Sequence, residues 1–404
     1  MLKKIIFAFQ ANFLVTVLNL IIILITSRYL GAAGRGYLSI IATYLGLIQL
    51  ITGIIGPGTL PFLLRKFNYA SIFFLAVLWS VTISIITTFL LTLVGFINRE
   101  ISIVFFLNAF TGSIFFLNIR MLISNNKLRW YNLLVILQPV IILACLFAFD
   151  NNFNRNDFFN FQFASYLIII LISTIILKGD IFKKPQISTI KKLTSEAFTL
   201  GAFNQLSSFT QLINYRLSFL FLEKFSGLKS VGIFSIILSI ANVVWLFSTT
   251  VGTLIGEEMN RFKDNYYKGL QLINKYLKVT ITVSLMFLVI INLLPSAVYV
   301  YILGLEFDSI RNYLMIFSPA ILIFSISKVS AFYFSSLGRV RVSFYASVIG
   351  LIPTLAGIWL IKYLDIYGVI ISTTLSFSFS TFVFLVYYFK NKKKSISVKP
   401  YFNK

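Results

Sequence analysis

Basic residues beside glycines are the side chains of this chain best suited to chemistry. The segment Arg28–Ser39 carries Arg28 and Arg35 around a glycine-rich bend. A guanidinium binds two phosphate oxygens at once, so two of them could hold a diphosphate. Similar spacing returns 196 residues later in Lys224–Ser235, where Lys224 takes the position of Arg28. The alternative, above all for Arg35, is an ordinary turn with interfacial arginines.

Two further basic residues fall inside long hydrophobic runs. Arg216 lies toward the predicted outer end of the run 198–222, and Lys328 lies in the inner third of the run 312–336. Charged residues at membrane depth usually mark a substrate pathway, which predicts contact with an anion in a water-filled cavity. Alternatively, their long side chains reach back to the nearest interface, which would be roughly 9 Å away for Arg216.

Polar side chains form a stripe on the first and on the seventh hydrophobic run. Helical spacing puts each stripe on one face, where it could line a cavity for sugar hydroxyls. It could equally form interhelical hydrogen bonds, each worth about 1 kcal/mol or less. We favour cavity lining, because each stripe lies on the first helix of a predicted lobe. The stripes consist of Asn12, Thr16, Asn19 and Thr26, and of Asn204, Ser208, Gln211, Tyr215 and Ser218.

Several kinds of catalytic group are missing from the sequence. There is no histidine, and the 12 acidic residues fall in predicted loops or at the ends of hydrophobic runs. No Gly-x-x-x-x-Gly-Lys loop, pair of catalytic carboxylates or metal-ligand cluster is present. The sequence therefore predicts neither an enzyme, nor a cofactor, nor a metal site. A cation or proton antiporter normally keeps a carboxylate at membrane depth, so its absence favours an anionic substrate.

The elements that position these residues are predicted membrane-spanning helices. The chain is 58% hydrophobic and 12% charged over 404 residues, and its mean hydropathy is +0.90. Continuous apolar runs of about 20 residues exclude a soluble protein and a β-barrel, and predict an all-α polytopic membrane protein. We place twelve spans at 5–27, 37–62, 70–96, 101–122, 131–149, 161–178, 198–222, 231–256, 276–299, 312–336, 342–361 and 367–389.

The distribution of Lys and Arg orients these spans. With a cytoplasmic N-terminus, the inside segments carry roughly three times as many basic residues as the outside segments. The net charge of +23 is therefore interpreted as topology rather than nucleic-acid binding. Both termini are predicted to be cytoplasmic.

Internal similarity predicts two lobes of six helices. The two glycine-bent corners lie 196 residues apart, and so do Arg65 and Arg261. An even number of helices per lobe gives both lobes the same orientation, with a pseudo-twofold axis along the membrane normal and a cavity between lobes. We predict an N-terminal lobe at 1–180, a basic linker at 181–197, a C-terminal lobe at 198–389 and a basic tail at 390–404. Predicted hinge residues are Gly31, Gly34, Gly36, Pro139 and Pro353.

Twelve spans, two lobes and the corner Arg28-Tyr-Leu-Gly31-x-x-Gly34-Arg35-Gly36 resemble the Wzx-type O-antigen and capsule flippases. These belong to the multidrug/oligosaccharidyl-lipid/polysaccharide exporter superfamily. The resemblance implies a bacterial inner-membrane protein that moves polyprenyl-diphosphate-linked oligosaccharide from the cytoplasmic to the outer leaflet. It also implies a polysaccharide polymerase and a chain-length regulator as partners, and Arg28, Arg216 and Lys328 as contacts of the diphosphate.

Three other functions stay open at this point. A drug or cation antiporter of the same superfamily would need an intramembrane Asp or Glu. A membrane glycosyltransferase or polymerase should carry catalytic residues on a large outer loop, whereas the outer loops here are short. A scaffold for an assembly complex would leave the intramembrane bases without a role. The flippase accounts for most of the observed features.

Overall fold

The structure is a computed structural model that describes residues 2–55, 59–149, 153–261 and 266–397. The described residues are almost all helical and form no strand. Nine helices in these ranges are long and apolar enough to cross a membrane. The helices are α1 (Leu2–Thr52), α2 (Leu60–Leu63), α3 (Tyr69–Leu93), α4 (Arg99–Ser124), α5 (Leu128–Ala148), α6 (Asp157–Ile176), α7 (Lys178–Ile181), α8 (Ile190–Arg261), α9 (Tyr266–Leu293), α10 (Ser296–Leu303), α11 (Ile310–Ser336) and α12 (Val340–Ser397), with short 3-10 turns at Gly53–Ile55, Ile187–Thr189 and Leu305–Phe307.

Three of the long helices bend at a single non-helical residue. The bends lie at Gly31 in α1, Gly227 in α8 and Asp365 in α12. Each bend divides a helix into two arms, so the nine long helices of the described ranges supply twelve membrane-crossing segments. This confirms the all-α polytopic fold class, and at each of these three places the chain departs from helical geometry at one residue.

Two of the bends repeat each other in detail. Gly31 has φ 66° and ψ −177°, and Gly227 has φ 80° and ψ 176°. This backbone region is essentially accessible to glycine alone. The 196-residue repeat of the sequence therefore reappears as a repeat of backbone conformation.

Some predicted boundaries are shifted. The span predicted at 37–62 corresponds to the second arm of α1, which ends at Thr52. The span predicted at 276–299 corresponds to α9, which ends at Leu293. Pro295 explains the second shift, because proline cannot continue a helix and restricts the residue before it. Pro295 instead precedes the short helix α10.

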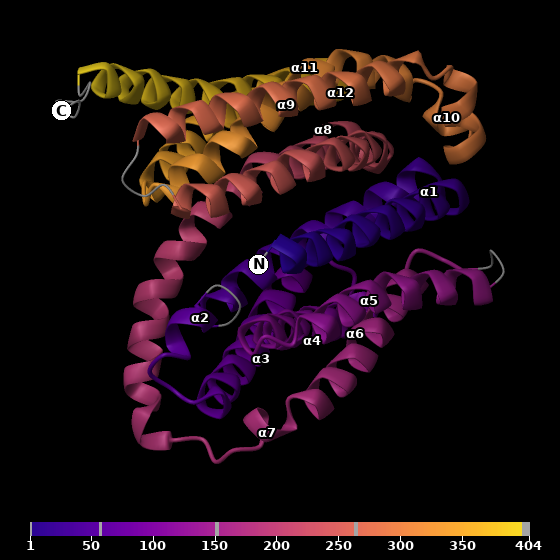
Figure 1. The fold of residues 1–404 in the computed structure, drawn as a ribbon. Helices are drawn as coiled ribbons and strands as arrows, with labels where there is room; N and C mark the ends of the chain where they lie inside the picture. The colour runs from indigo at the N-terminus through magenta and orange to yellow at the C-terminus, as the bar shows by residue number, and fades with distance from the viewer. Residues whose placement is uncertain (1, 56–58, 150–152, 262–265, 398–404) are drawn as a thin grey trace. The chain divides into compact units, whose positions relative to one another are not determined.

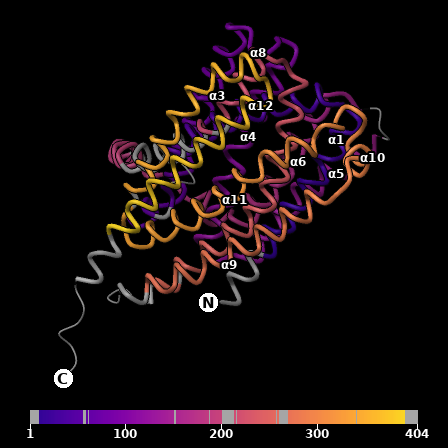
Figure 2. The backbone as a smooth tube through the Cα atoms, turned by 90° about the horizontal axis from the view of Figure 1, so that it is seen from above, coloured from indigo at the N-terminus to yellow at the C-terminus, as the bar shows by residue number. Residues whose placement is uncertain are grey.

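The first of two compact units contains residues 1–30 and 40–209. Within it α4 packs against α3 and α6, and α5 against α6 (Figures 1 and 2). Its core contains the fully buried Ile72, Leu122 and Ile169. Leu193 and Ala197, from the beginning of α8, belong to the same core. The second half of the segment 181–197 is therefore helical and packed on this unit.

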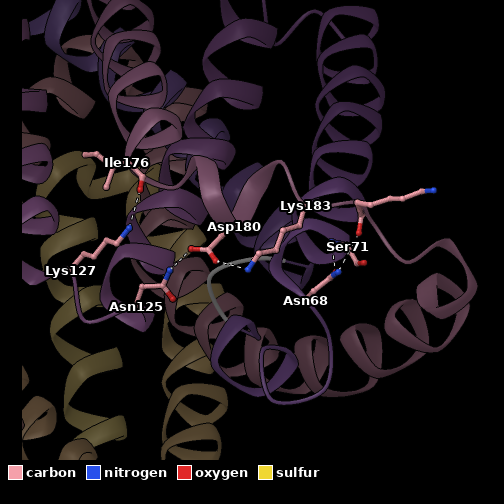
Figure 3. Close-up of polar contacts among 8 residues, drawn as sticks. Asn68, Ser71, Asn125, Lys127, Ile176, Asp180 and Lys183 are labelled. Atoms are coloured by element: carbon pink, nitrogen blue, oxygen red, sulfur yellow. Dashed lines mark hydrogen bonds and ion pairs between the residues drawn. The ribbon is translucent and has the colours of Figure 1, made fainter.

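Polar contacts hold the segment before α8 in place. Asp180 accepts a hydrogen bond from Asn125 Nδ2 at 2.8 Å and pairs with Lys183 at 3.4 Å (Figure 3). Asn68 caps α3 by accepting a hydrogen bond from Ser71 N at 3.0 Å (Figure 3). Its Nδ2 donates to Lys184 O at 3.4 Å. Side-chain caps of this kind stabilise a helix by about 1 kcal/mol.

The second unit contains residues 31–39 and 210–404. In it α11 packs along both α12 and α9 (Figures 1 and 2). Its core joins Ile255 of α8, Ile273 of α9, Phe334 of α11 and Phe384 of α12. The corner residues 31–39, although they belong to α1, are grouped with this unit because of the contacts described next.

Candidate functional site

The centre of the candidate site is a crossing of two helical arms in the second unit. A Cβ built on Gly36 would lie 1.9 Å from Leu228 O, and one built on Gly232 would lie 1.8 Å from Ala32 O. Both contacts involve backbone atoms, so the two arms touch main chain to main chain. Small residues permit such close approach, as in the small-xxx-small pattern of membrane helices, here Ala32 and Gly36.

The crossing is reciprocal. Gly36 and Gly232 are 196 residues apart, and so are their partners Ala32 and Leu228. Gly36 contacts Leu228, and the residue equivalent to Gly36 contacts the residue equivalent to Leu228. Such an exchange of equivalent residues across a contact is characteristic of a local twofold arrangement. The two corners singled out by the sequence therefore pack against each other, each through its own glycine.

Glu306 binds the beginning of the helical arm that follows Gly31. Its Oε2 accepts a hydrogen bond from Ala32 N at 2.6 Å. The bend at Gly31 starts a new helical arm, whose first N–H groups lack carbonyl partners and attract negative charge. Glu306 therefore acts as a cap that comes from a distant part of the chain.

Replacing Glu306 by alanine is expected to lower the free energy of unfolding by about 1–2 kcal/mol, because Ala32 N then lacks its acceptor. Glu306→Gln retains an acceptor but loses the charge, so its effect should be smaller. The thermal midpoint of the detergent-solubilised protein measures both. Asp308→Ala is the control, since this exposed carboxylate in the same segment accepts a hydrogen bond from Oγ of its neighbour Ser309. Equal midpoints for the Glu306 and Asp308 variants would contradict the capping role.

Arg35 lies in the arm that Glu306 caps. Its side chain is partly buried, and its Nε is enclosed and donates to no atom of the described residues. Its guanidinium interacts electrostatically with that of Arg216 in α8, a like charge. Two guanidiniums held near each other in a partly buried place repel, and an anion between them relieves the repulsion. The pair is therefore a candidate anion site.

Arg216 is held by aromatic neighbours as well. Its guanidinium carbon lies 5.5 Å from the ring centroid of Phe219, which is buried. Phe219 in turn packs edge-on against Phe234, with centroids 5.7 Å apart. A cation over an aromatic face gains electrostatic attraction without losing its charge.

Lys328 of α11 lies against a separate aromatic group. Its Nζ is 5.1 Å from the centroid of Phe324, which stacks on Phe377 at 4.1 Å and meets Trp245 at 4.7 Å. The described contacts of Lys328 therefore provide a cation–π interaction. They do not join Lys328 to the pair Arg35 and Arg216, and its role in substrate binding stays a prediction.

The remaining predicted substrate contacts are dispersed or undescribed. Arg28 is exposed and lies in the first unit. Asn12 is exposed and accepts from Tyr131 OH at 3.4 Å, and Asn19 is half-buried. The side chains of Asn204, Gln211 and Tyr215 lie outside the described part of the chain. All of these substrate roles remain predictions.

The predicted hinge residues occupy different environments. Gly31 is the bend itself, while Gly36 lies in the tight crossing, where its lack of a side chain permits contact. Pro139 and Pro353 lie buried inside α5 and α12. Motion at these positions, Gly34 included, stays a prediction.

Sequence reasoning missed the roles of Glu306 and Leu228. Glu306 is one of the acidic residues of the predicted loops, and no pattern in the sequence connects it with Ala32, 274 residues away. One signal for this contact was available in the sequence. A glycine bend leaves the first N–H groups of the next helical arm without carbonyl partners, so an acceptor from another part of the chain is required.

Known structures share this fold over nearly the whole chain. The lipid II flippase MurJ, in an inward closed conformation, matches with a TM-score of 0.78 and 15% identity, covering 97% of this chain and 91% of that one. An inward-facing multidrug resistance MATE family transporter of the MOP superfamily matches with a TM-score of 0.75 and 13% identity, covering 96% of each chain. A MOP superfamily transporter from Pyrococcus furiosus, described as having a binding pocket of reverse polarity, matches with a TM-score of 0.61 and 14% identity, covering 98% of this chain and 96% of that one.

No protein-family model matches the sequence, and a comparison with curated proteins gives no match either. Identities of this size establish the fold alone. The compared structures are transporters, and the fold of this chain is that of the MOP-superfamily transporters.

Proposed function

We propose that this protein is a flippase that moves polyprenyl-diphosphate-linked oligosaccharide from the cytoplasmic to the outer leaflet by alternating access, for synthesis of a surface polysaccharide such as O-antigen or capsule. The observation that carries the proposal is the pair Arg35 and Arg216. Both lie in membrane-crossing helices of one unit, both are partly buried, and they interact with each other.

The chemistry of this substrate fits a site of that kind. A diphosphate and its sugars must cross about 30 Å of hydrocarbon, where their hydration is lost. Two guanidiniums offer paired N–H donors that match phosphate oxygens and replace part of that hydration. The polyprenyl tail can remain in lipid during the passage. Fold likeness adds support, since one of the compared structures is named a lipid II flippase.

A drug or cation antiporter is the second candidate. The likeness to a multidrug resistance MATE transporter favours it about as strongly as the other likeness favours a flippase. In our proposal, the charge of the residues within the spans distinguishes the flippase from the antiporter. In the described spans, acidic residues lie near helix ends or near a bend, such as Glu223 before Gly227. A cationic drug would meet two guanidiniums without a carboxylate at mid-span.

The surroundings of the protein are part of the proposal. We place it in the bacterial inner membrane with both termini in the cytoplasm, as the distribution of basic residues predicts. A flippase for surface polysaccharide would deliver its product to a polymerase and a chain-length regulator, which makes these its proposed partners.

Reconstituted transport tests the function directly. Proteoliposomes receive a fluorescent polyprenyl-diphosphate oligosaccharide, and a membrane-impermeant quencher reports its appearance in the other leaflet. We expect faster appearance than in protein-free liposomes, and no acceleration for a neutral lipid with the same fluorophore. Uptake of a cationic dye without movement of the lipid would show an antiporter instead. Growth of the glycan into polymer would show an enzyme.

A further inference from the structure

A groove of about 660 Å³ runs between α9 and α11 within the second unit. Its walls are almost wholly apolar. Leu285, Val289 and Leu293 line it from α9, while Met315, Pro319 and Leu322 line it from α11. Several of these side chains are strongly exposed, with Leu293 at 74% and Val289 at 55%. A groove with such walls on a membrane-crossing helix pair faces hydrocarbon rather than water.

Pro319 helps to form the groove. Proline has no N–H, so the helical bond to the carbonyl of Met315 cannot form, and the ring pushes against the preceding turn. Such a position loosens or kinks a helix. Both residues line the groove, so the turn of α11 that lacks this bond lies at the groove.

One end of the groove is polar and the other is not. Arg311 lies in the first turn of α11, and Asn292 in the last turn of α9. Arg311 Nε donates to Asn292 O at 3.4 Å, and Asn292 Nδ2 donates to Ser318 Oγ at 2.9 Å. A guanidinium carries five N–H donors, of which this long bond uses one. The guanidinium of Arg311 therefore lies at the polar end of the apolar groove.

The length of the groove corresponds to one leaflet. The lining residues extend from Leu285 to Leu293 on α9 and from Arg311 to Leu322 on α11. At 1.5 Å per residue these stretches measure roughly 12–17 Å. Half of the bilayer hydrocarbon is about 15 Å. An acyl chain that starts at a headgroup beside Arg311 would therefore lie along the groove down to the bilayer midplane.

We propose that the groove between α9 and α11 is a binding site for a membrane glycerophospholipid, whose phosphate contacts Arg311 and one of whose acyl chains lies against Met315, Pro319 and Leu322. The charge of Arg311 matches the phosphate, and the walls match the chain. By the predicted orientation of the helices, the lipid belongs to the outer leaflet. This site is separate from Arg35 and Arg216 and does not depend on the proposed transport function.

Photo-crosslinking tests the site. The full-length protein is reconstituted with phosphatidylglycerol that carries a diazirine in its acyl chain, illuminated, digested and analysed by peptide mass spectrometry. We expect crosslinks concentrated on Leu285–Leu293 and Met315–Leu322. Arg311→Gln should reduce them about tenfold, the loss expected for one charge-assisted hydrogen bond. Arg311→Lys should retain most of the labelling.

A second pair of variants tests the apolar part without touching the charge. Met315→Trp fills the groove and should reduce labelling, whereas Ile316→Trp places the same bulk on an exposed neighbour that does not line it. Thermal midpoints confirm that each variant is folded. Equal labelling of all variants would show ordinary annular lipid and overturn the proposal. Labelling by a polyprenyl-diphosphate probe but not by the phospholipid would also overturn it, because the occupant would then be the transported lipid.

Discussion

Alanine at Gly36 or Gly232 is expected to be the most damaging small substitution in this protein. The added Cβ would lie 1.9 Å from Leu228 O or 1.8 Å from Ala32 O, in both cases a backbone oxygen that no rotamer change can move. The two arms must then separate, and the close packing between them is lost. Overpacking in a dense core costs about 1–3 kcal/mol, and a clash with main chain belongs at the upper end of that range. We therefore expect a lower thermal midpoint and less folded protein in the membrane fraction.

Two other glycines supply matched controls. Gly46 in α1 and Gly256 in α8 are helical, and a Cβ at either would meet nothing within 4 Å. Alanine there should be neutral or slightly stabilising, by up to about 1 kcal/mol, because alanine favours the helix. Thermal midpoints, measured by fluorescence-detection size-exclusion chromatography after heating, should distinguish the variants at the crossing from these control variants. If Gly36→Ala and Gly46→Ala behaved alike, the crossing could not be as tight as described.

Neutralising either member of the guanidinium pair is expected to abolish most transport of a diphosphate lipid. Arg35→Gln or Arg216→Gln removes charge-assisted hydrogen bonds to phosphate, each worth about 1.5–3 kcal/mol. This corresponds to a roughly ten- to hundredfold loss in transport rate at low substrate concentration. The variants should fold, because each relieves the repulsion between two like charges. Lysine at either position keeps the charge but not the planar fork, and should give an intermediate rate.

The double variant and a distant arginine make this prediction decisive. If both residues hold one phosphate group, Arg35→Gln and Arg216→Gln together should cost less than the sum of the single losses. Arg99→Gln, at the exposed beginning of α4, should transport at the normal rate. Arg28→Gln in the same assay tests the predicted role of that exposed residue. Normal transport by both single variants would remove Arg35 and Arg216 from the mechanism.

The position of Arg35 depends on the same crossing that the glycine variants disturb. Arg35 immediately precedes Gly36, and the arm that contains both begins at the residue capped by Glu306. The glycine contact therefore fixes the distance between the arms, and the cap fixes the beginning of one of them. Both features orient Arg35 relative to Arg216 through backbone contacts rather than through a side-chain ion pair.

Much of the fold followed from local properties of the sequence. Runs of about 20 apolar residues predicted the membrane-crossing helices, because the cost of burying polar groups in hydrocarbon applies to each segment by itself. The 196-residue spacing of Gly31 and Gly227 predicted two equivalent bends, since the required backbone conformation is specific to glycine at each place. The boundary at Leu293 was missed although Pro295 marked it.

Contacts between distant segments were decided only by tertiary packing. The contact of Gly36 with Leu228, the cap of Glu306 on Ala32, and the electrostatic interaction of Arg35 with Arg216 all depend on tertiary packing. They require α1, α8 and the turn Leu305–Phe307 to approach one another. The groove at Arg311 likewise exists only because α9 and α11 leave space beside Pro319. Hydropathy and residue spacing act within a single helix, whereas these contacts depend on the shapes of surfaces that the folded chain brings together. The sequence by itself therefore determined the membrane class, the helices and their repeat, and the tertiary structure determined which distant residues contact one another.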